Sequence, residues 1–411
     1  MVFRLQRPAP RCLRTRCPAR SIPPLYSMLF AMQCARSMYI VLVSWFALQR
    51  TGDLASVGKI LICWQFLAFT LGPFIGPLID RSRRRMVFAI GEAIHGAGVG
   101  LLAVIAWTCS PQHTPVPVLY ATACFISIGS LLSSPSSQAL IQLVGARSLA
   151  RTVSFSILCG QVGNVVGAAA GGLCLAGLGI SGGLALCATS SFLAMAFASL
   201  LNVQTDIGPM HSGRHLQDLV AGLRQTLASR SLRSACFALL LAYASAHASN
   251  ALLAGFARSE LALPSTVYGW LAAMYSGGGL IGSVTLACFS GVARERILIA
   301  LGTVLLAAAT AALSTSQTMA QAVFWQALIG LAFTMVRAGS DVTLLKALST
   351  RMVGRVRSNI DAAIGLVAML VYLLPTLASG QSARQLFLGL AGVLACGSGA
   401  VLWMQRGRGP G

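Results

Sequence analysis

The sequence predicts an all-α membrane protein with twelve transmembrane helices, and three observations support this fold class. The chain has 411 residues, of which 56% are hydrophobic and only 9% are charged, and its mean hydropathy is +0.76. Soluble domains carry roughly 25% charged residues, so this chain has too few to cover a water-facing surface. The apolar residues form twelve runs that are long enough to cross a bilayer. The basic residues gather in alternate connections between these runs.

The predicted spans divide into two groups of six. The first group is 27–48, 55–79, 86–108, 116–140, 152–178 and 182–202, and the second is 234–256, 267–291, 297–316, 319–344, 358–379 and 384–404. Between the groups lies the longest internal connection, 203–233, which contains an amphipathic stretch. We expect two pseudo-symmetric halves, 27–202 and 234–405, arranged around a site near the middle of the membrane.

The placement of arginine and lysine predicts the orientation in the membrane. We number the connections between spans in chain order. Two to six basic residues lie in each even-numbered connection, in the segment 1–26 and in the tail 406–411. Each odd-numbered connection carries one or none. Cytoplasmic segments carry the excess of basic residues, so both termini and the central loop are expected in the cytoplasm. The first 26 residues are read as a basic tail and not as a signal peptide, because no small-residue cleavage site follows an apolar region. Met28 offers an alternative translation start.

Several classes of function are disfavoured by what the sequence contains. The net charge of +21 does not indicate nucleic-acid binding, because the arginines lie beside apolar runs and lack interleaved aromatic residues. The twelve cysteines are scattered and form no CxxC pair, so neither a metal site nor a cofactor is expected. No phosphate-binding GxxxxGK[ST] loop is present, and no nucleophile and base are grouped. An enzyme is therefore not predicted.

The stretch GPLIDRSRRRM at 76–86 combines an acid with four arginines in one short connection. It resembles the signature loop of the major facilitator superfamily, G-x-L-a-D-R-x-G-R-K, with Arg83 in place of the second glycine. The matching residues are Gly76, Leu78, Asp80, Arg81, Arg84 and Arg85. The resemblance implies a conformational latch in which the acid engages the end of the eleventh span, near Asp361. The alternative is a charge cluster that only fixes the topology.

A second stretch, GNVVGAAAGG at 163–172, resembles the antiporter motif of the same superfamily. The match rests on Gly163, Gly167, Gly171 and Gly172, with Ala168 where proline is usual. Small residues four apart let a partner helix come close, and ordinary helix packing is the alternative interpretation. The stretches ALQRTGDLASVGKI, VYGWLAAMYSGGGLIGS and GRV are similar to the branch that contains bacterial drug exporters and siderophore exporters of the enterobactin-exporter type. This resemblance covers about 30–405.

Ionisable and polar residues inside the predicted spans are the candidates for a site, because such residues are costly in a bilayer. They are Arg36, Glu92, His95, His247, Asn250, Arg337, Asp341 and Asp361. Spans 1, 4, 7 and 10 line the cavity in the superfamily, which implies that Arg36, His247, Asn250 and Arg337 contact the substrate, with Tyr39, Trp45 and Trp325 as aromatic walls. Glu92, Asp341 or Asp361 would carry the proton. The alternatives are an ion pair in which Arg337 and Asp341 neutralise each other, and ordinary polar contacts at His247 and Asn250.

These observations together predict a multi-pass secondary transporter of the bacterial cytoplasmic membrane that acts as a monomer. Two arginines near a central site favour an anionic substrate, such as a siderophore or an organic acid. A proton-coupled exporter is the expectation, and an importer or symporter of the same fold is the alternative. A ligand sensor that transports nothing and a lipid-handling membrane protein are the remaining alternatives.

Overall fold

The computed structural model describes residues 21–80, 82–109, 113–145, 149–202, 224–226, 229–288, 295–348, 350–378 and 380–406. Within these ranges the chain forms twelve α-helices of 21 to 30 residues. The first six are α1 (Ile22–Thr51), α2 (Leu54–Asp80), α3 (Arg84–Thr108), α4 (Val116–Val144), α5 (Leu149–Gly177) and α6 (Gly179–Ser199). The others are α8 (Arg230–Gly255), α9 (Ser265–Cys288), α10 (Glu295–Thr315), α11 (Met319–Ala347), α12 (Thr350–Leu377) and α13 (Ala383–Arg406). A short π-helix, η2 (Phe256–Glu260), continues α8.

Each predicted span coincides with one long helix, and the largest difference is at the start of α12. This helix begins at Thr350, whereas the apolar run begins at residue 358. Polar residues end an apolar run, but they do not interrupt the backbone hydrogen bonds of a helix. The helix therefore extends beyond the part that hydropathy identifies. The amphipathic stretch of the central connection lies largely outside the described residues.

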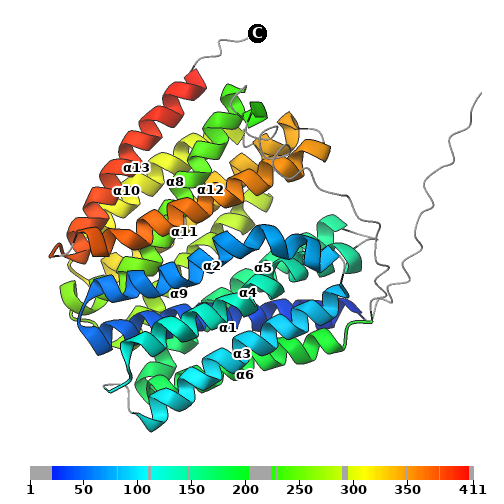
Figure 1. Ribbon diagram of the computed structural model, residues 1–411. Helices are drawn as coiled ribbons and strands as arrows, with labels where there is room; N and C mark the ends of the chain where they lie inside the picture. Colours follow the sequence, from blue (N-terminus) through cyan, green and yellow to red (C-terminus); the bar gives the residue numbers. More distant parts are fainter. Residues whose placement is uncertain are drawn as a thin grey trace, which may run out of the picture.

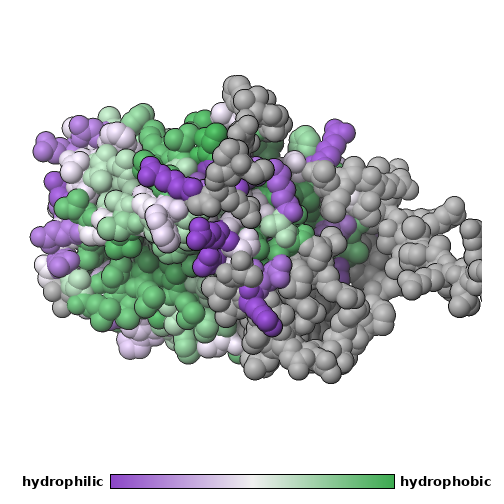
Figure 2. All heavy atoms as spheres, turned by 90° about the horizontal axis from the view of Figure 1, so that it is seen from above, coloured by the Kyte–Doolittle hydropathy of each residue, from purple (hydrophilic) through white to green (hydrophobic). Residues whose placement is uncertain are grey.

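Eleven segments of the described chain are long and apolar enough to cross a membrane. Of the long helices, α9 is the one outside this set. It packs against α5 and α11, so neighbouring helices cover much of its surface. Figure 2 shows apolar side chains over much of the visible face, with hydrophilic side chains at the left end and in a second group nearer the middle. The protein is therefore a multi-pass membrane protein, and the twelfth crossing stays a prediction.

The helices form two groups, α1–α6 and α8–α13 (Figure 1). Two pairs of helices make the most extensive contacts between the groups: α5 packs against α9, and α2 packs against α12. Figure 1 shows the groups close together at the left of the view and diverging toward the right. The left is the end at which α1 finishes and α2 begins.

The closest approaches between the halves occur at this converging end. A Cβ atom added to Gly172, near the end of α5, would lie 2.7 Å from Cα of Gly269, near the start of α9. A Cβ atom on Gly58, near the start of α2, would overlap the backbone carbonyl of Tyr372, near the end of α12. Glycine at these positions lets two pairs of helix backbones touch across the boundary between the halves.

The buried apolar side chains are grouped in a way that matches this arrangement. One large cluster includes residues of both halves, such as Leu42 and Phe46 with Leu252 and Tyr268. A second cluster, around Met28, contains residues of the first half only. A third, which includes Leu232, Leu344 and Ile360, contains residues of the second half only. The described halves thus share a core at one end and pack separately at the other.

Candidate functional site

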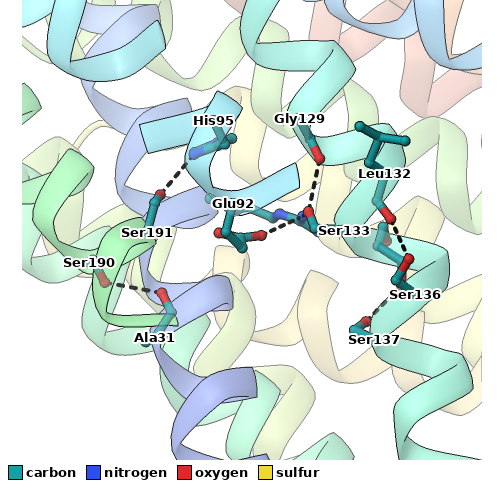
Figure 3. A network of polar contacts seen from close by, with 12 residues as sticks. Ala31, Glu92, His95, Gly129, Leu132, Ser133, Ser136, Ser137, Ser190 and Ser191 are labelled. Carbon is teal, nitrogen blue, oxygen red and sulfur yellow. Dashed lines mark hydrogen bonds and ion pairs between the residues drawn. The ribbon is translucent and has the colours of Figure 1, made fainter. Parts of the chain in front are cut away.

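A buried ion pair joins α1 to α3 inside the first half. Nη2 of Arg36 lies 3.3 Å from Oε1 of Glu92, and the two side chains are 13% and 1% exposed. The same nitrogen donates a hydrogen bond to Oγ of Ser133 on α4, at 2.6 Å. Ser133 in turn donates to the carbonyl of Gly129, one turn earlier (Figure 3). The arginine thus connects α1, α3 and α4.

His95 lies one turn after Glu92 but contacts a different neighbour. Its Nδ1 is 2.8 Å from Oγ of Ser191 on α6 (Figure 3). Its ring packs edge-on against Tyr39. The spacing of Glu92 and His95 predicts a shared helix face, and both side chains are buried on α3. Their serine partners, Ser133 and Ser191, could not be identified from the sequence, because serine is common in apolar helices.

Three polar atoms in this network have no hydrogen-bond partner within the described residues. They are Nε of Arg36, Oε2 of Glu92 and Oη of Tyr39. Buried polar groups usually find partners, and an unpaired one costs about 1–3 kcal/mol. The network is therefore incompletely satisfied. A proton added to Glu92 would remove the charge that holds Arg36.

A second set of charges lies on α11 and α12 of the other half. Oδ1 of Asp341 accepts a hydrogen bond from Nη1 of Arg357 at 2.7 Å, whereas its Oδ2 is 3.8 Å from Nε of Arg337. Arg357 also pairs with Asp361 at 3.4 Å. Arg337 is 46% exposed and Asp361 is 60% exposed. Asp341 is thus shared between two arginines and is closer to Arg357, a residue that the spacing within α11 does not indicate.

Aromatic rings from α8, α9 and α11 pack beside Arg337. The ring of Phe333, one turn before Arg337, contacts Tyr243 edge-on at 5.1 Å and Tyr275 at 5.9 Å between centroids. Oη of Tyr275 is buried without a partner among the described residues. These three rings were not predicted as site residues, because aromatic residues in apolar runs cannot be distinguished from core residues.

His247 and Asn250 of α8 both approach Tyr372 of α12. Nδ1 of His247 forms a 2.8 Å hydrogen bond with Oη of Tyr372, and the Asn250 amide interacts with the same hydroxyl. Nε2 of His247 is buried and has no partner within the described residues. One imidazole nitrogen therefore remains available to a further hydrogen-bonding group. Across the described chain, no three histidine, cysteine or carboxylate side chains are grouped closely enough to hold a metal ion.

Two of the aromatic residues expected to line the site, Trp45 and Trp325, contact other aromatic rings. Trp45 of α1 stacks on Tyr268 of α9, with centroids 5.6 Å apart and an interplanar angle of 23°. The guanidinium of Arg258 lies over the same indole, 6.0 Å from its centroid. This group connects the two halves at their converging end. Trp325 packs against Phe324 on its own helix, α11.

Only part of the loop between α2 and α3 can be compared with the expected latch. Gly76, Leu78 and Asp80 belong to the last turns of α2, but their side chains lie outside the described residues, and so does Arg81. Arg84 begins α3. Arg85 donates a hydrogen bond to the carbonyl of Leu201 at 2.7 Å, which ties α3 to the end of α6. Asp361 pairs with Arg357 of its own helix.

The glycines of 163–172 contact two different helices. A Cβ atom on Gly163 would lie 2.6 Å from the carbonyl oxygen of Phe30, and one on Gly167 would overlap the backbone of Cys34. One on Gly171 would lie 3.2 Å from the side chain of Val41. These three glycines face α1 of the same half, whereas Gly172 faces Gly269 of the other half.

Solved structures of transporters share this fold at low sequence identity. A mutant of the nucleoside transporter NupG has a TM-score of 0.78 and 14% identity, covering 94% of this chain and 100% of the other. A bacterial homolog to the human lysosomal transporter Spinster, in an inward-facing and unoccupied conformation, has a TM-score of 0.72 and 12% identity over 94% and 96%. A POT family transporter in complex with 5-aminolevulinic acid has a TM-score of 0.74 and 13% identity over 93% and 96%.

The comparison with sequence families agrees with the fold. No curated protein sequence matches the chain. The model of the Major Facilitator Superfamily matches residues 25–233, just over half of the chain. That match covers the first half and the central connection, and the similar structures cover both halves. The chain therefore belongs to the Major Facilitator Superfamily and is a membrane transporter, not an enzyme.

Proposed function

We propose that this protein is a proton-coupled exporter of a small anionic molecule that works by alternating access. The observation that carries the proposal is the unequal packing of the two halves, which share a core at one end and have separate cores at the other. Rocking of two such halves around a central site would expose that site to each side of the membrane in turn. The excess of basic residues in the connections at the separated end favours a cytoplasmic location for this end and for both termini. The chain acts as a monomer with twelve crossings in the bacterial cytoplasmic membrane.

The charges and rings on α11 support an anionic substrate. Asp341 is 2.7 Å from Arg357 and 3.8 Å from Arg337, so Arg337 has the weaker hold on this carboxylate. A half-exposed guanidinium next to the ring of Phe333 can bind a carboxylate while the ring packs on an apolar or aromatic group. Carboxylate or catecholate siderophores and organic acids have this chemistry. The substrates of the similar structures differ from one another, so the shared fold does not select among them.

Proton coupling is supported by the pairing of each candidate acid with an arginine. Glu92 pairs with Arg36, and Asp361 pairs with Arg357. Protonation removes the negative charge of the carboxylate and releases the arginine, which can then bind an anion or allow its helix to move. Loss of the proton restores the pair. Substrate binding and proton binding would thus alternate, as an exchanger requires.

Reconstitution in vesicles tests this function. We expect an imposed pH gradient to drive net flux of an organic acid or siderophore in the direction opposite to the flow of protons. Arg337→Gln should weaken the apparent affinity for anions. The variants Glu92→Gln, Asp341→Asn and Asp361→Asn are compared at equal amounts of folded protein. At least one of them should retain exchange of substrate but lose its dependence on the pH gradient.

The outcomes of this experiment separate the alternatives. Flux that stays pH-driven in all three acid variants would remove these carboxylates as proton carriers. Flux in the same direction as the proton gradient would indicate a symporter or importer. Binding of ligand without any flux would indicate a sensor, and movement of phospholipid alone would indicate a lipid-handling protein.

The latch resemblance gives a second expected result. Asp80→Asn should leave insertion and orientation intact, because the arginines of the same connection determine topology. It should reduce transport strongly if the acid stabilises one conformation by engaging the start of α12. The measurement compares flux with the amount of protein in the membrane. Unchanged flux per inserted molecule would show that the stretch serves topology alone.

A further inference from the structure

An aromatic and cationic contact joins the two halves at the end where they converge. The indole of Trp45, in the last turns of α1, stacks on the ring of Tyr268 in the first turn of α9. The guanidinium of Arg258, in η2, lies 6.0 Å from the centroid of the same indole. Trp45 belongs to the first half, and both of its partners belong to the second. We call these three residues the Trp45 clamp.

The clamp adjoins the closest backbone crossing between the halves. Tyr268 is followed by Gly269, whose backbone meets that of Gly172 on α5. Tyr268 is only 2% exposed and Trp45 is partly buried, so the stacked rings have little contact with water in this arrangement. Stacked aromatic rings attract each other beyond the effect of burial alone. The two rings lie in different halves, so this end cannot open while the stack is intact.

The π-helix η2 holds Arg258 in place. Its wide turn is closed by a hydrogen bond from the amide of Leu261 to the carbonyl of Phe256, five residues earlier. Glu260, two residues after Arg258, pairs with Arg384 of α13 at 3.4 Å. The π-helix is thus tied to its own half through Glu260, and Arg258 extends from it to the indole of the other half.

A cation over an aromatic ring suits a contact that has to break repeatedly. Among the described residues Arg258 forms no ion pair, and its side chain is exposed beside the indole. Separation of a buried ion pair leaves an uncompensated charge, which is strongly destabilising. Separation of Arg258 from Trp45 leaves an apolar ring face and a guanidinium that water can solvate. Such a contact changes an equilibrium by only about two- to five-fold.

We propose that the Trp45 clamp is the gate of the converging end. Arg258 holds the indole against Tyr268 while this end is closed, and the end opens when the indole leaves both partners. The inference rests on the alternating access proposed above. It assigns Trp45 and Arg258 as residues that position the two halves, so Trp45 acts here as part of a gate and not as a wall of the substrate cavity.

Hydrogen exchange of the purified full-length protein in detergent tests the clamp. The amides of η2 and of the first turn of α9 should exchange about ten-fold faster in Trp45→Leu, because the indole contacts both partners. They should exchange about two- to five-fold faster in Arg258→Gln. Trp45→Phe keeps a ring and Arg258→Lys keeps a cation, so each should cause a smaller increase than the variant that removes the group.

A double variant and two matched controls show whether the effect comes from this contact. Trp45→Leu combined with Arg258→Gln should exchange no faster than Trp45→Leu alone, because the guanidinium has already lost its ring. Arg50→Gln is the control at the same end, since Arg50 donates a hydrogen bond to the carbonyl of Thr114 within its own half. Trp325→Leu is the control for loss of an indole, since Trp325 packs against its own helix. Neither control should change exchange in η2.

The remaining outcomes separate failure of the clamp from failure of the proposed function. Equal exchange in Trp45→Leu and Trp325→Leu would overturn the clamp, and so would fully additive effects in the double variant. The expected exchange pattern in a protein that moves no organic acid or siderophore in vesicles would support the clamp and refute the proposed transport. Folding is checked by circular dichroism. If Trp45→Leu does not fold, Trp45→Phe and Arg258→Gln decide, because the first keeps a ring and the second alters an exposed side chain.

Discussion

Replacement of Glu92 by alanine is expected to destabilise the folded protein by about 3–5 kcal/mol, because it leaves a buried arginine without its counter-ion. Arg36 is only 13% exposed, and its remaining partner, Ser133, is neutral. A guanidinium keeps its charge in proteins, so it cannot escape the cost of burial by losing a proton. The measurement is thermal or denaturant unfolding of the detergent-purified protein, followed by its tryptophan fluorescence.

Two controls separate loss of a buried charge pair from loss of any ion pair. Glu295→Ala removes the partner of Lys346 in an exposed pair, where the expected loss is about 0–1 kcal/mol. The double variant Arg36→Leu with Glu92→Leu removes both charges and should recover most of the stability, because no charge remains buried. Equal losses for Glu92→Ala and Glu295→Ala would contradict the buried pair. A double variant that is as unstable as Glu92→Ala would contradict it as well.

Substitution of Gly172 by alanine is expected to reduce transport strongly while leaving the protein folded. The added methyl group would lie 2.7 Å from Cα of Gly269, and backbone cannot move aside as a side chain can. Overpacking of this kind costs about 1–3 kcal/mol. The cost falls only on the conformation in which α5 and α9 touch, so the equilibrium shifts about 5- to 150-fold away from it. The closed end should open more often.

Transport assays and hydrogen exchange measure the two parts of this result. Backbone amides at the start of α9 and in η2 should exchange faster in Gly172→Ala than in the unaltered protein, because the closed end protects them less. Gly177→Ala on α5 and Gly277→Ala on α9 are matched controls. A Cβ atom at Gly177 has no neighbour within 4 Å, and one at Gly277 has only the sulfur of Met274, at 4.0 Å. Transport equal to the controls would show that this crossing does not matter for function.

The helices could be predicted from the sequence because transfer of an apolar run into a bilayer depends on that run alone. Each of the twelve predicted runs overlaps one long helix over most of its described length. The predicted span 358–379 agrees with the candidate crossing Asn359–Leu377, whereas α12 itself begins at Thr350, because its polar first turns continue the helix beyond the apolar part.

The candidate site was only partly predictable. Charges within apolar runs are conspicuous, so Arg36, Glu92 and Asp341 could be singled out from the sequence. Their partners could not. Arg36 and Glu92 are 56 residues apart, and Asp341 is closest to Arg357 on the next helix. The short-range spacing of Asp341 and Arg337 indicated only the weaker of the two contacts at this carboxylate.

The sequence by itself determined the class of protein, the helices and the expected direction of insertion, because these follow from local hydropathy and from the side on which basic residues lie. Only the tertiary structure decided which charges pair, which glycines separate two backbones, and which end of the two halves is closed. Coulomb energy and close packing depend on distances between residues far apart in the chain. A transporter must also pack its two halves in at least two ways with one sequence. Which end is closed is therefore decided by the packing of the two halves and not by local sequence.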